Sequence, residues 1–378
     1  MRILVISYEF PPVGGGGGHV ARDICRELRR RGHEIHVLTS HYSGLPRQEN
    51  QDGVFIERVP AIRRWLFRAD MLTMGAFVLS GIWGGLRSLR AWRPDVIHVH
   101  FAVPSGPVAW IISRLSGIPY VLTAHLGDVP NGVPEKTAGW FRWIFPFTPP
   151  IWKDAAAAVA VSEHTRQLAL QCYPVNVRVI PNGIELPAPA SAAIHVNDPP
   201  RIIFAGRFVP QKNPLQIIHT LASLRDLPWQ CNLIGDGPLL ANIEQAIQDR
   251  GLQERIGLAG WVDPKHVVEH LSASDILFMP SISEGLSIIA IQALNAGLAI
   301  VASDIGGFID LVSPGENGYL VRIDQPQGYE AALRRLLSDP ARLRAFRLAS
   351  QQKAPAFDIG NVTAEYEEIF QAVVESQE

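Results

Sequence analysis

Residues 2–28 read RILVISYEFPPVGGGGGHVARDICREL, and this stretch contains a strand, a loop and a helix in that order. The apolar run from Ile3 to Ile6 predicts a buried strand, and residues 20–28 have the apolar spacing of a helix. Five consecutive glycines, Gly14 to Gly18, lie between them. Glycines let the backbone approach a ligand closely, and a helix N-terminus favours an anion. The stretch therefore predicts a phosphate-binding loop at the carboxyl end of the first strand.

The glycine loop has two other possible interpretations. A nicotinamide dehydrogenase would need the spacing G-x-G-x-x-G, but His19 or Val20 fills its last position in either register. The second predicted strand also ends in Thr39-Ser40, where an acidic residue would hold a ribose. These departures argue against a dehydrogenase. A loop that is merely mobile remains an alternative.

Short runs rich in Val and Ile alternate with longer amphipathic stretches along the whole chain, which is typical of helices wound around parallel sheets. A segment rich in Pro and Ala, 186–200, interrupts this pattern and predicts a linker. We therefore expect two doubly wound α/β lobes, with ligands at the carboxyl ends of their strands. The predicted strands are 2–7, 34–39, 95–99, 119–123, 157–161 and 177–180, then 201–205, 230–234, 276–279 and 299–301.

The first predicted strand of the second lobe ends in Gly206-Arg207, and Lys212 follows just before a helix expected from about Asn213. Two cations at a strand end suit a diphosphate whose negative charge grows as a glycosyl bond breaks. No Asp-x-Asp occurs in the sequence, so the carboxylate pair that commonly holds a divalent ion on a nucleotide diphosphate is missing. We expect the cations to replace it, although such a pair can also be a plain surface charge cluster.

The stretch 278–297 reads FMPSISEGLSIIAIQALNAG. It predicts a strand end, then Glu284 and Gly285, then a helix from about Leu286. Gln292 lies eight residues after Glu284, just over two helical turns, so we expect both on one side, where a polyhydroxylated ligand would meet them.

In this order the motifs resemble those of the retaining GT-B glycosyltransferases of glycosyltransferase family 4, also called glycosyl transferases group 1. The resemblance covers nearly the whole chain. It rests on the glycine loop ending in His19-Val20, Gly32-His33-Glu34, residues 95–100 (DVIHVH), Thr123-Ala124-His125, Val161-Ser162-Glu163, residues 179–184 (VIPNGI), Gly206-Arg207, Lys212, residues 234–238 (IGDGP), Gly260-Trp261-Val262 and residues 280–297.

The resemblance implies a GT-B fold, an α/β architecture of two Rossmann-like doubly wound domains facing a central cleft. The final helix, from about Asn361, would cross back onto the first lobe. The expected domains are thus 1–184 plus 361–378 on the acceptor side, and 185–360 for the nucleotide-sugar. The activity implied is retaining transfer of a hexose from a nucleotide-sugar.

The resemblance also implies roles for individual residues. The backbone of Gly14, Gly15 and Gly16 would meet the diphosphate and the sugar, and His125 would contact the sugar near the reacting centre. The diphosphate would be neutralised by Arg207 and Lys212 and by the amides of Leu286, Ser287 and Ile288. Glu284 would hold sugar hydroxyls.

One position departs from the family pattern. A second glutamate, eight residues after the first, grips the nucleotide ribose in the family, and this chain has Gln292 there. Glutamine keeps a carbonyl acceptor but loses the charge that makes such hydrogen bonds about twice as strong. We expect weaker donor binding with activity retained. The alternative is a catalytically weak or inactive protein that binds nucleotide-sugars.

Composition fits a cytoplasmic enzyme. The 378 residues are 47% hydrophobic and carry a net charge of −2, and the three cysteines show no CxxC spacing that would indicate a metal site. Met1-Arg2 leads directly into the first strand, so no signal peptide is expected, and the longest uncharged run, 71–86, is too short to span a membrane. No cofactor and no metal are expected. The nucleotide-sugar, UDP- or GDP-linked, is a substrate.

Charge and aromatic residues bear on partners. Residues 1–186 hold 20 Lys/Arg against 14 Asp/Glu, and two segments of this basic half interleave aromatic residues with arginines, 63–68 (RRWLFR) and 140–152. Such segments suit peripheral contact with the inner membrane face and a lipid-linked acceptor, or else they pack in the core. The acceptor is expected to be lipid-linked or a saccharide. The slightly negative overall charge gives no support for nucleic-acid binding.

Three further polar residues, Asp128, His98 and His100, are candidates for supporting roles. Asp128 either orients His125 or the acceptor, or simply caps a turn. His98 and His100 fall on one face of a strand and are expected to be structural, because no third metal ligand is identifiable.

Overall fold

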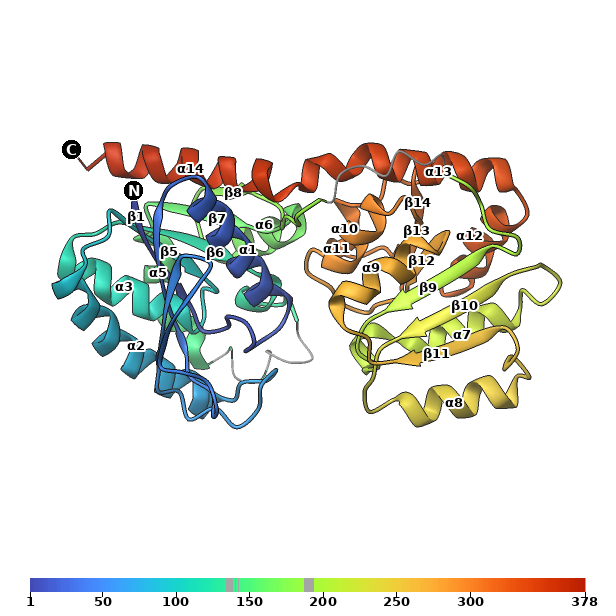
Figure 1. The fold of residues 1–378 in the computed structure, drawn as a ribbon, viewed down its shortest axis with the longest axis horizontal. Helices are drawn as coiled ribbons and strands as arrows, with labels where there is room; N and C mark the ends of the chain where they lie inside the picture. Colours follow the sequence, from blue (N-terminus) through green and yellow to red (C-terminus); the bar gives the residue numbers. More distant parts are fainter. Residues whose placement is uncertain (134–138, 140, 142, 187–193, 378) are drawn as a thin grey trace. The chain divides into compact units, whose positions relative to one another are not determined.

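The computed structural model describes residues 1–133, 139, 141, 143–186 and 194–377, with the backbone alone for Pro264 and Lys265. The chain divides into two compact units. Unit 1 comprises Met1–Glu185 with Asp358–Glu378, and unit 2 comprises Leu186–Phe357. Each unit is a mainly parallel sheet covered by helices, so the predicted pair of Rossmann-like α/β domains is confirmed (Figure 1).

Unit 1 contains an eight-stranded sheet in the order β3-β4-β2-β1-β5-β6-β7-β8. Every neighbouring pair is parallel except β3 and β4, which are antiparallel. The central strands β1 and β5 are buried along nearly their whole length, as expected of a sheet covered on both faces. The strands are β1 (Arg2–Ser7), β2 (Glu34–Ser40), β3 (Gln48–Gln51), β4 (Val54–Val59), β5 (Val96–His100), β6 (Tyr120–Ala124), β7 (Ala157–Ala160) and β8 (Val177–Val179).

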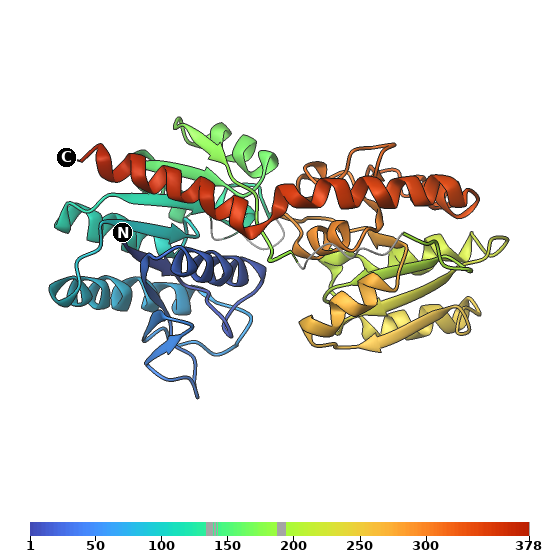
Figure 2. The same cartoon turned by 45° about the horizontal axis from the view of Figure 1, so that its top comes forward.

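Helices lie on both faces of this sheet. The long helix α2 (Met71–Ala91) packs beside α3 (Ser105–Ser116) on one face, and α1 (Gly16–Arg30) lies beside the C-terminal helix α14 (Ile359–Glu375) on the other (Figure 2). An ion pair between Arg31 and Glu367, 2.5 Å apart, helps to hold α14 on unit 1. The remaining elements are the 3₁₀ turns η1 (Leu126–Asp128) and η2 (Phe145–Phe147) and the helices α5 (Pro149–Lys153) and α6 (Glu163–Cys172).

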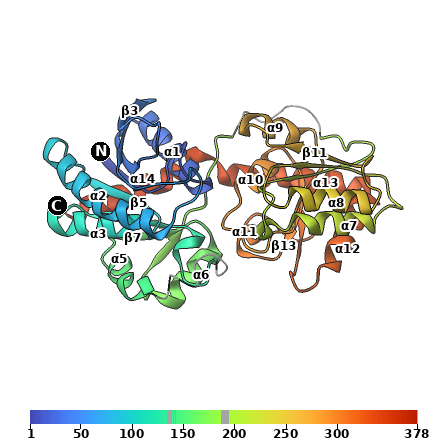
Figure 3. The ribbon, with the colours of Figure 1, turned by 90° about the horizontal axis from the view of Figure 1, so that it is seen from below.

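Unit 2 contains a six-stranded parallel sheet in the order β11-β10-β9-β12-β13-β14. Helices α7 and α8 pack together, and α10 packs against both α9 and α13 (Figure 3). The strands are β9 (Arg201–Ala205), β10 (Gln230–Ile234), β11 (Ile256–Gly260), β12 (Ile276–Met279), β13 (Ala299–Ser303) and β14 (Gly318–Val321). The helical elements are η3 (Pro210–Lys212), α7 (Pro214–Ala222), α8 (Leu240–Asp249), α9 (Pro264–Ser272), α10 (Ile288–Asn295), α11 (Gly306–Ile309), α12 (Gln327–Leu337), α13 (Pro340–Lys353) and η4 (Ala354–Phe357).

All ten strands expected from the sequence are present, and four more were not anticipated: β3, β4, β11 and β14. β3 reads QENQ and has no apolar face, because it pairs as a partly exposed edge strand. β11 is an edge strand that contains Gly257 and Gly260, and glycine has a low preference for strands. These strands form because neighbours supply their hydrogen bonds, which local composition does not reveal.

Two further expectations concern the linker and membrane-spanning segments. Residues 187–193, in the predicted linker, lie outside the described residues. Among the residues that are described, no helix is long and apolar enough to cross a membrane.

Candidate active site

The order of the strands locates a ligand site in each unit. In unit 1 the chain proceeds outward from β1 through β2 and β4 and then returns to β5 on the other side of β1. In unit 2 it proceeds from β9 through β10 and β11 and returns to β12. At such switch points the loops after the two central strands diverge, and open α/β sheets bind ligands there. The loops after β1 and β5, and those after β9 and β12, are therefore the candidate ligand sites.

In unit 2 the switch point joins two of the predicted site residues directly. Lys212, at the end of η3 after β9, forms an ion pair between its Nζ and Oε2 of Glu284 in the loop after β12. Both side chains are only 16% exposed. The two loops are also joined by their neighbours: the backbone N–H of Ile282 donates to the Gln211 carbonyl at 2.7 Å, and the Gln211 side chain donates to the Ser283 carbonyl at 3.0 Å. The cation and the carboxylate are therefore held as one unit.

Arg207 lies at the same end of the sheet but is exposed. The loop after β10 packs closely against the loop that carries Arg207. A Cβ on Gly235 would lie 1.9 Å from the Gly206 carbonyl oxygen, and one on Gly237 would lie 2.6 Å from that of Phe208. Only glycine allows this approach at both positions. Arg207 thus projects from a rigid base, and its guanidinium is accessible to an anionic ligand.

A residue that the sequence analysis overlooked supports Glu284. Gly307, in α11 after β13, lies against the loop that carries Glu284. A Cβ at Gly307 would lie 1.8 Å from the Gly285 carbonyl oxygen and 2.6 Å from Cβ of Glu284. The pair Gly306-Gly307, shortly after the predicted strand 299–301, was the available signal, since glycine can mark a close approach of two backbone segments.

The helix α10 begins at Ile288, so one part of the sequence argument is wrong. Glu284 lies four residues before the helix, and helical periodicity does not relate it to Gln292. Gln292 is instead one turn into α10, where its side chain is half-buried. Leu286 and Ser287 are buried, Ser287 being the residue that precedes the helix, and Ile288 opens its first turn.

In unit 1 the glycines lie between β1, which ends at Ser7, and α1, whose first turn contains Gly16–Gly18, but the first amides of this stretch have partners within the protein. The N–H of Gly14 donates to the Leu66 carbonyl at 3.0 Å, and the N–H of Gly15 donates to Oε2 of Glu9 at 2.9 Å. A Cβ at Gly14 would collide with the Glu9 side chain at 2.4 Å. Glu9 was not singled out from the sequence. Its carboxylate already accepts the Gly15 N–H, which was expected to face the diphosphate. Gly16 is the first residue of α1.

His125 follows β6 and lies next to this loop. Its ring stacks on Phe101, which follows β5, with the centroids 4.4 Å apart. A Cβ on Gly17 would lie 2.6 Å from Cζ of Phe101 and 3.4 Å from Cε1 of His125. Phe101 has φ +71°, unusual for a non-glycine residue, and this geometry aims its ring at the loop. The structure thus brings the glycine loop and His125 together.

Asp128 both caps a turn and positions His125. Its Oδ2 accepts the backbone N–H of His125 at 2.8 Å, and the side chain is 3% exposed. Burial raises the pKa of Asp128 to about 8, although backbone hydrogen bonds from His125 and from Ala102 and Val103 act in the opposite direction. The carboxyl therefore carries a proton for much of the time at neutral pH.

The two histidines of β5 are fully buried. The rings of His98 and His100 lie 4.3 Å apart, and His98 packs on Tyr366 of α14 and bonds to Thr123 Oγ1 at 2.9 Å. Burial lowers the pKa of His98 to about 3 and that of His125 to about 4, and it lowers the pKa of His100 well below its ordinary value. All three rings are therefore neutral at pH 7. Among the described residues, no cluster of three metal-ligating side chains occurs.

These histidines predict that the protein loses stability in mild acid. An unfolded chain takes up a proton on each histidine below pH 6.5, and the folded chain does not, so each one costs up to about 1.4 kcal/mol of unfolding free energy per pH unit between 6.5 and 4. Asp128 acts in the opposite direction over this range, because it is protonated in the folded chain only. With three histidines against one aspartate, the net effect is destabilising as the pH falls.

The variant His100→Phe provides the measurement. Phenylalanine keeps a planar ring but takes up no proton in the unfolded chain. We expect the wild type to lose more stability than the variant in urea titrations between pH 7 and 5.5. Equal losses would show that His100 is protonated in the folded protein.

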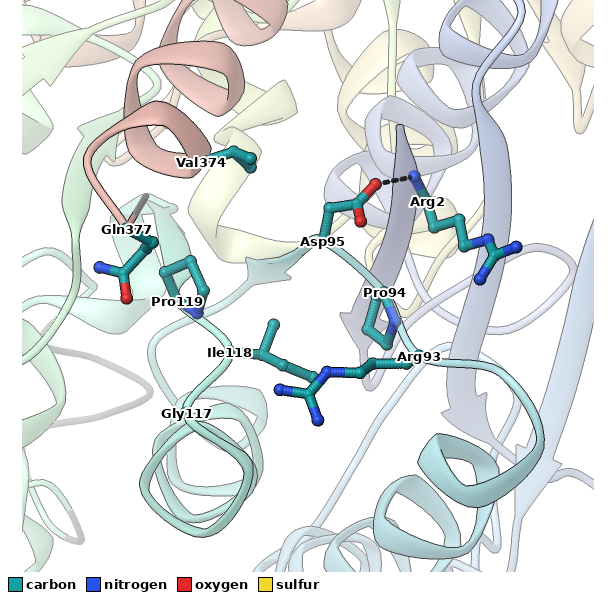
Figure 4. Close-up of a pocket in the computed structure, with 9 residues that line it drawn as sticks. All are labelled: Arg2, Arg93, Pro94, Asp95, Gly117, Ile118, Pro119, Val374 and Gln377. Carbon is teal, nitrogen blue, oxygen red and sulfur yellow. Dashed lines mark hydrogen bonds between the residues drawn. The ribbon is translucent and has the colours of Figure 1, made fainter.

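The structure also has an open pocket of about 370 Å³ at the opposite end of the unit 1 strands (Figure 4). It is lined by residues at the amino ends of β1, β5 and β6, including Arg2, Asp95 and Pro119. The backbone N–H of Arg2 donates to Asp95 there at 2.7 Å. Because ligands of open α/β sheets bind at the carboxyl ends, this pocket is not the candidate active site.

The family models match both halves of the chain. The model described as "Glycosyl transferase 4-like domain" matches residues 15–183, within unit 1. The model described as "Glycosyl transferases group 1" matches residues 191–353, within unit 2. Together they include every predicted site residue except Gly14.

Relatives and solved structures agree with this assignment. The chain is 28% identical to the α-maltose-1-phosphate synthase of Mycolicibacterium smegmatis, over 99% of this chain and 100% of that protein. The sucrose-phosphate synthase of Thermosynechococcus elongatus has the same fold, with a TM-score of 0.85 at 22% identity over 99% of both chains. The Anabaena protein HepE, solved with UDP-glucose, has a TM-score of 0.74 at 18% identity over 98% of this chain and 100% of its own. The chain therefore belongs to the family 4-like glycosyltransferases of the GT-B fold, and it is a glycosyltransferase.

Proposed function

We propose that this enzyme transfers a hexose from a UDP- or GDP-linked donor to a lipid-linked or saccharide acceptor, with retention of anomeric configuration and without a metal ion. The main support for this proposal is the arrangement at the switch point of unit 2, where Arg207 is accessible and Lys212 is paired with Glu284. Two cations and a carboxylate at one strand end suit a diphosphate and a polyhydroxylated sugar. The binding of UDP-glucose by HepE supports the choice of donor class.

In this proposal the protein acts mainly by electrostatic stabilisation. As the glycosyl bond breaks, negative charge develops on the diphosphate, and Arg207 and Lys212 offset it more strongly in the transition state than in the bound donor. Glu284 accepts hydrogen bonds from sugar hydroxyls and orients the ring. The neutral His125 ring, stacked on Phe101, offers a hydrogen-bonding group at the sugar without adding positive charge.

Retention is proposed to occur by departure and attack on one face of the sugar. A double displacement would need an ionised carboxylate on the acceptor side as nucleophile. Asp128 is buried, and its raised pKa leaves it largely protonated, so it is a poor nucleophile. The Glu9 carboxylate accepts the Gly15 N–H. The departing phosphate oxygen is the better base for the incoming acceptor hydroxyl.

The proposal is tested by a donor screen followed by product analysis. Thermal shift with UDP-, GDP- and ADP-sugars identifies the donor, and NMR of the product or of the hydrolysed sugar gives its anomeric configuration. We expect stabilisation by a UDP- or GDP-sugar and retention. An inverted product would overturn the stereochemistry. Saturable nucleotide binding without turnover would instead favour the weak or inactive alternative, for which Gln292 is the motivating residue.

Metal independence gives a separate prediction. Because the chain lacks Asp-x-Asp and has two cations at the diphosphate site, excess EDTA should leave turnover unchanged. The measurement is the initial rate before and after chelation, with Mg²⁺ or Mn²⁺ added back. A loss of rate that a divalent ion restores would overturn this account of charge balance.

The substitution Gln292→Glu is expected to tighten donor binding. A charged acceptor strengthens a hydrogen bond to a ribose hydroxyl by about 1 kcal/mol, which corresponds to about fivefold in affinity. Calorimetric titration with the nucleotide measures this, and Asn295→Asp, on the same helix, controls for added charge alone. Unchanged or weaker affinity in Gln292→Glu would show that residue 292 does not face the ribose.

A further inference from the structure

Helix α2 has an unusual distribution of side chains for the surface of a globular domain. Apart from Phe77, the buried residues of α2 are small: a Cβ on Gly84 would lie 2.7 Å from Val59, and one on Gly85 would lie 2.3 Å from Ile112. Glycine therefore lets α2 approach the sheet and α3 very closely. The outward face carries the large apolar side chains, with Leu79 74% exposed and Trp83 67% exposed. A surface helix normally has the opposite polarity.

The loop before α2 extends this apolar surface. Ile62, Trp65 and Phe67 are all exposed, and Ile62 has φ +48°, a strained conformation for a β-branched residue. The loop runs alongside α2, because Ser80 Oγ donates to the Pro60 carbonyl at 2.5 Å. We call the set Ile62, Trp65, Phe67, Leu72, Leu79 and Trp83 the α2 face.

A buried arginine anchors this loop while its neighbours remain exposed. The Arg63 side chain is 8% exposed, and it donates to Ser40 Oγ at 3.0 Å and to the Tyr8 carbonyl at 3.3 Å. These bonds fix the loop to the ends of β1 and β2. The apolar side chains of the α2 face are therefore held outward by a structured base.

The charged residues within the segment 62–94 are almost all positive, although Arg87 is paired with Glu57 of β4 at 3.0 Å. Residues 62–94 contain six arginines and no lysine, against the single carboxylate of Asp70. Asp70 is used within the protein, where it caps α2 by accepting the Thr73 N–H at 2.8 Å. Arg64, Arg68 and Arg90 are exposed, and Arg68 lies over the Trp65 ring at 5.7 Å. Exposed aromatic and aliphatic side chains bordered by arginines are typical of surfaces that rest in an anionic membrane interface.

From these observations we propose that the α2 face docks the enzyme on an anionic lipid bilayer. The surface also borders the candidate active site of unit 1, because the Leu66 carbonyl accepts the Gly14 N–H of the glycine loop. A lipid-linked acceptor in the bilayer would then present its head group beside that loop. The placement of a lipid-linked acceptor rests on the proposed function. The inference adds the docking surface, which is the α2 face, and its partner, which is an anionic bilayer.

The second aromatic segment, residues 140–152, is not part of the α2 face. Trp140 and Arg142 lie outside the described residues, and Trp152 is buried in the core of unit 1. Trp143 and Phe147 are exposed, but they belong to the segment just before α5, far from α2 in the sequence. The bilayer contact is therefore assigned to residues 62–90.

The test is co-sedimentation of the full chain with phosphatidylcholine vesicles that contain or lack phosphatidylglycerol. We expect binding to the anionic vesicles, weakened several-fold by high salt. The pair Leu79→Ser with Trp83→Ser should reduce binding at least tenfold, and Arg64→Ser with Arg68→Ser should reduce it by about fivefold per arginine. The matched control pair is Trp261→Ser with Leu348→Ser, two exposed positions in unit 2. Melting temperatures should stay at the wild-type value, since all of these side chains are exposed.

Three outcomes would overturn the proposal: no binding by the wild type, equal loss in the control pair, or a wild-type dimer that the Leu79/Trp83 pair converts to monomer. The last would show that the α2 face pairs with a second copy of the chain. Nucleotide release from the donor, by hydrolysis or by transfer to a panel of soluble saccharide and lipid-linked acceptors, is measured in parallel in the absence of vesicles. Vesicle binding without nucleotide release from any donor would refute the proposed function alone, and release without vesicle binding would refute the docking surface alone.

Discussion

Replacing Arg207 by alanine is expected to lower turnover about 100-fold or more, which is the scale of losing one donor that stabilises charge in a transition state. Arg207 is exposed on a loop fixed by Gly235 and Gly237, so its removal leaves the fold intact. The measurements are the single-turnover rate and the thermal unfolding midpoint. A fall in rate with an unchanged midpoint would place the guanidinium in the reaction.

Lys212→Ala should lower the rate by a similar factor but with a different effect on stability. Its Nζ is paired with Glu284, and both side chains are largely buried, so alanine leaves a carboxylate without its cation. We expect a lower unfolding midpoint in Lys212→Ala than in Arg207→Ala. Arg322→Ala removes an exposed cation that is paired on the surface of unit 2, and it serves as the control. Near-native rates in Arg207→Ala and Lys212→Ala would remove both residues from the mechanism.

The second large effect is expected from Gly307→Ala. The added Cβ would lie 1.8 Å from the Gly285 carbonyl oxygen and 2.6 Å from Cβ of Glu284, so the loop after β12 must move. A displacement of about 1 Å at a group that positions substrate can cost about 100-fold in rate. We expect kcat/KM to fall by about that factor, together with weaker donor binding.

Gly257→Ala provides the matched control for this substitution. Gly257 is in β11 of the same unit, and a Cβ there would make only an ordinary contact, 3.5 Å from Asn232 Oδ1. It should leave kcat/KM within a factor of about two of the wild-type value. Wild-type activity in Gly307→Ala would mean that the loop accommodates the methyl group without moving Glu284.

Much of this architecture is predictable because its signals are local. Ile3 to Ile6 form a strand buried on both faces, which appears in the sequence as a continuous apolar run. Gly14 to Gly18 mark the turn into α1, where the backbone at Gly14 has a positive φ and passes too close to Glu9 for a side chain. Arg207, Lys212 and Glu284 lie in the segments that connect a strand to the next helix, and the rule that ligands bind at strand ends selects these segments without knowledge of the strand pairing.

Other features depend on neighbours that are distant in the sequence. The polar strand β3 forms only because β4 is beside it, and Gly307 matters only because it contacts the Glu284 loop. Gln292 was related to Glu284 by helical spacing, but the helix starts at Ile288, because the loop after β12 is held by contacts with Gln211 and Gly307.

The sequence by itself determined that two α/β units with glycine and cation loops at their strand ends belong to a glycosyltransferase, because strand burial, turn chemistry and motif order are written in adjacent residues. Only the tertiary structure decided that Lys212 is paired with Glu284, that Glu9 occupies an amide of the glycine loop, and that α2 presents its apolar side outward. Each of these depends on which surfaces pack together in the fold. Packing joins residues that are far apart in the sequence, and the local spacing of apolar residues does not predict such contacts.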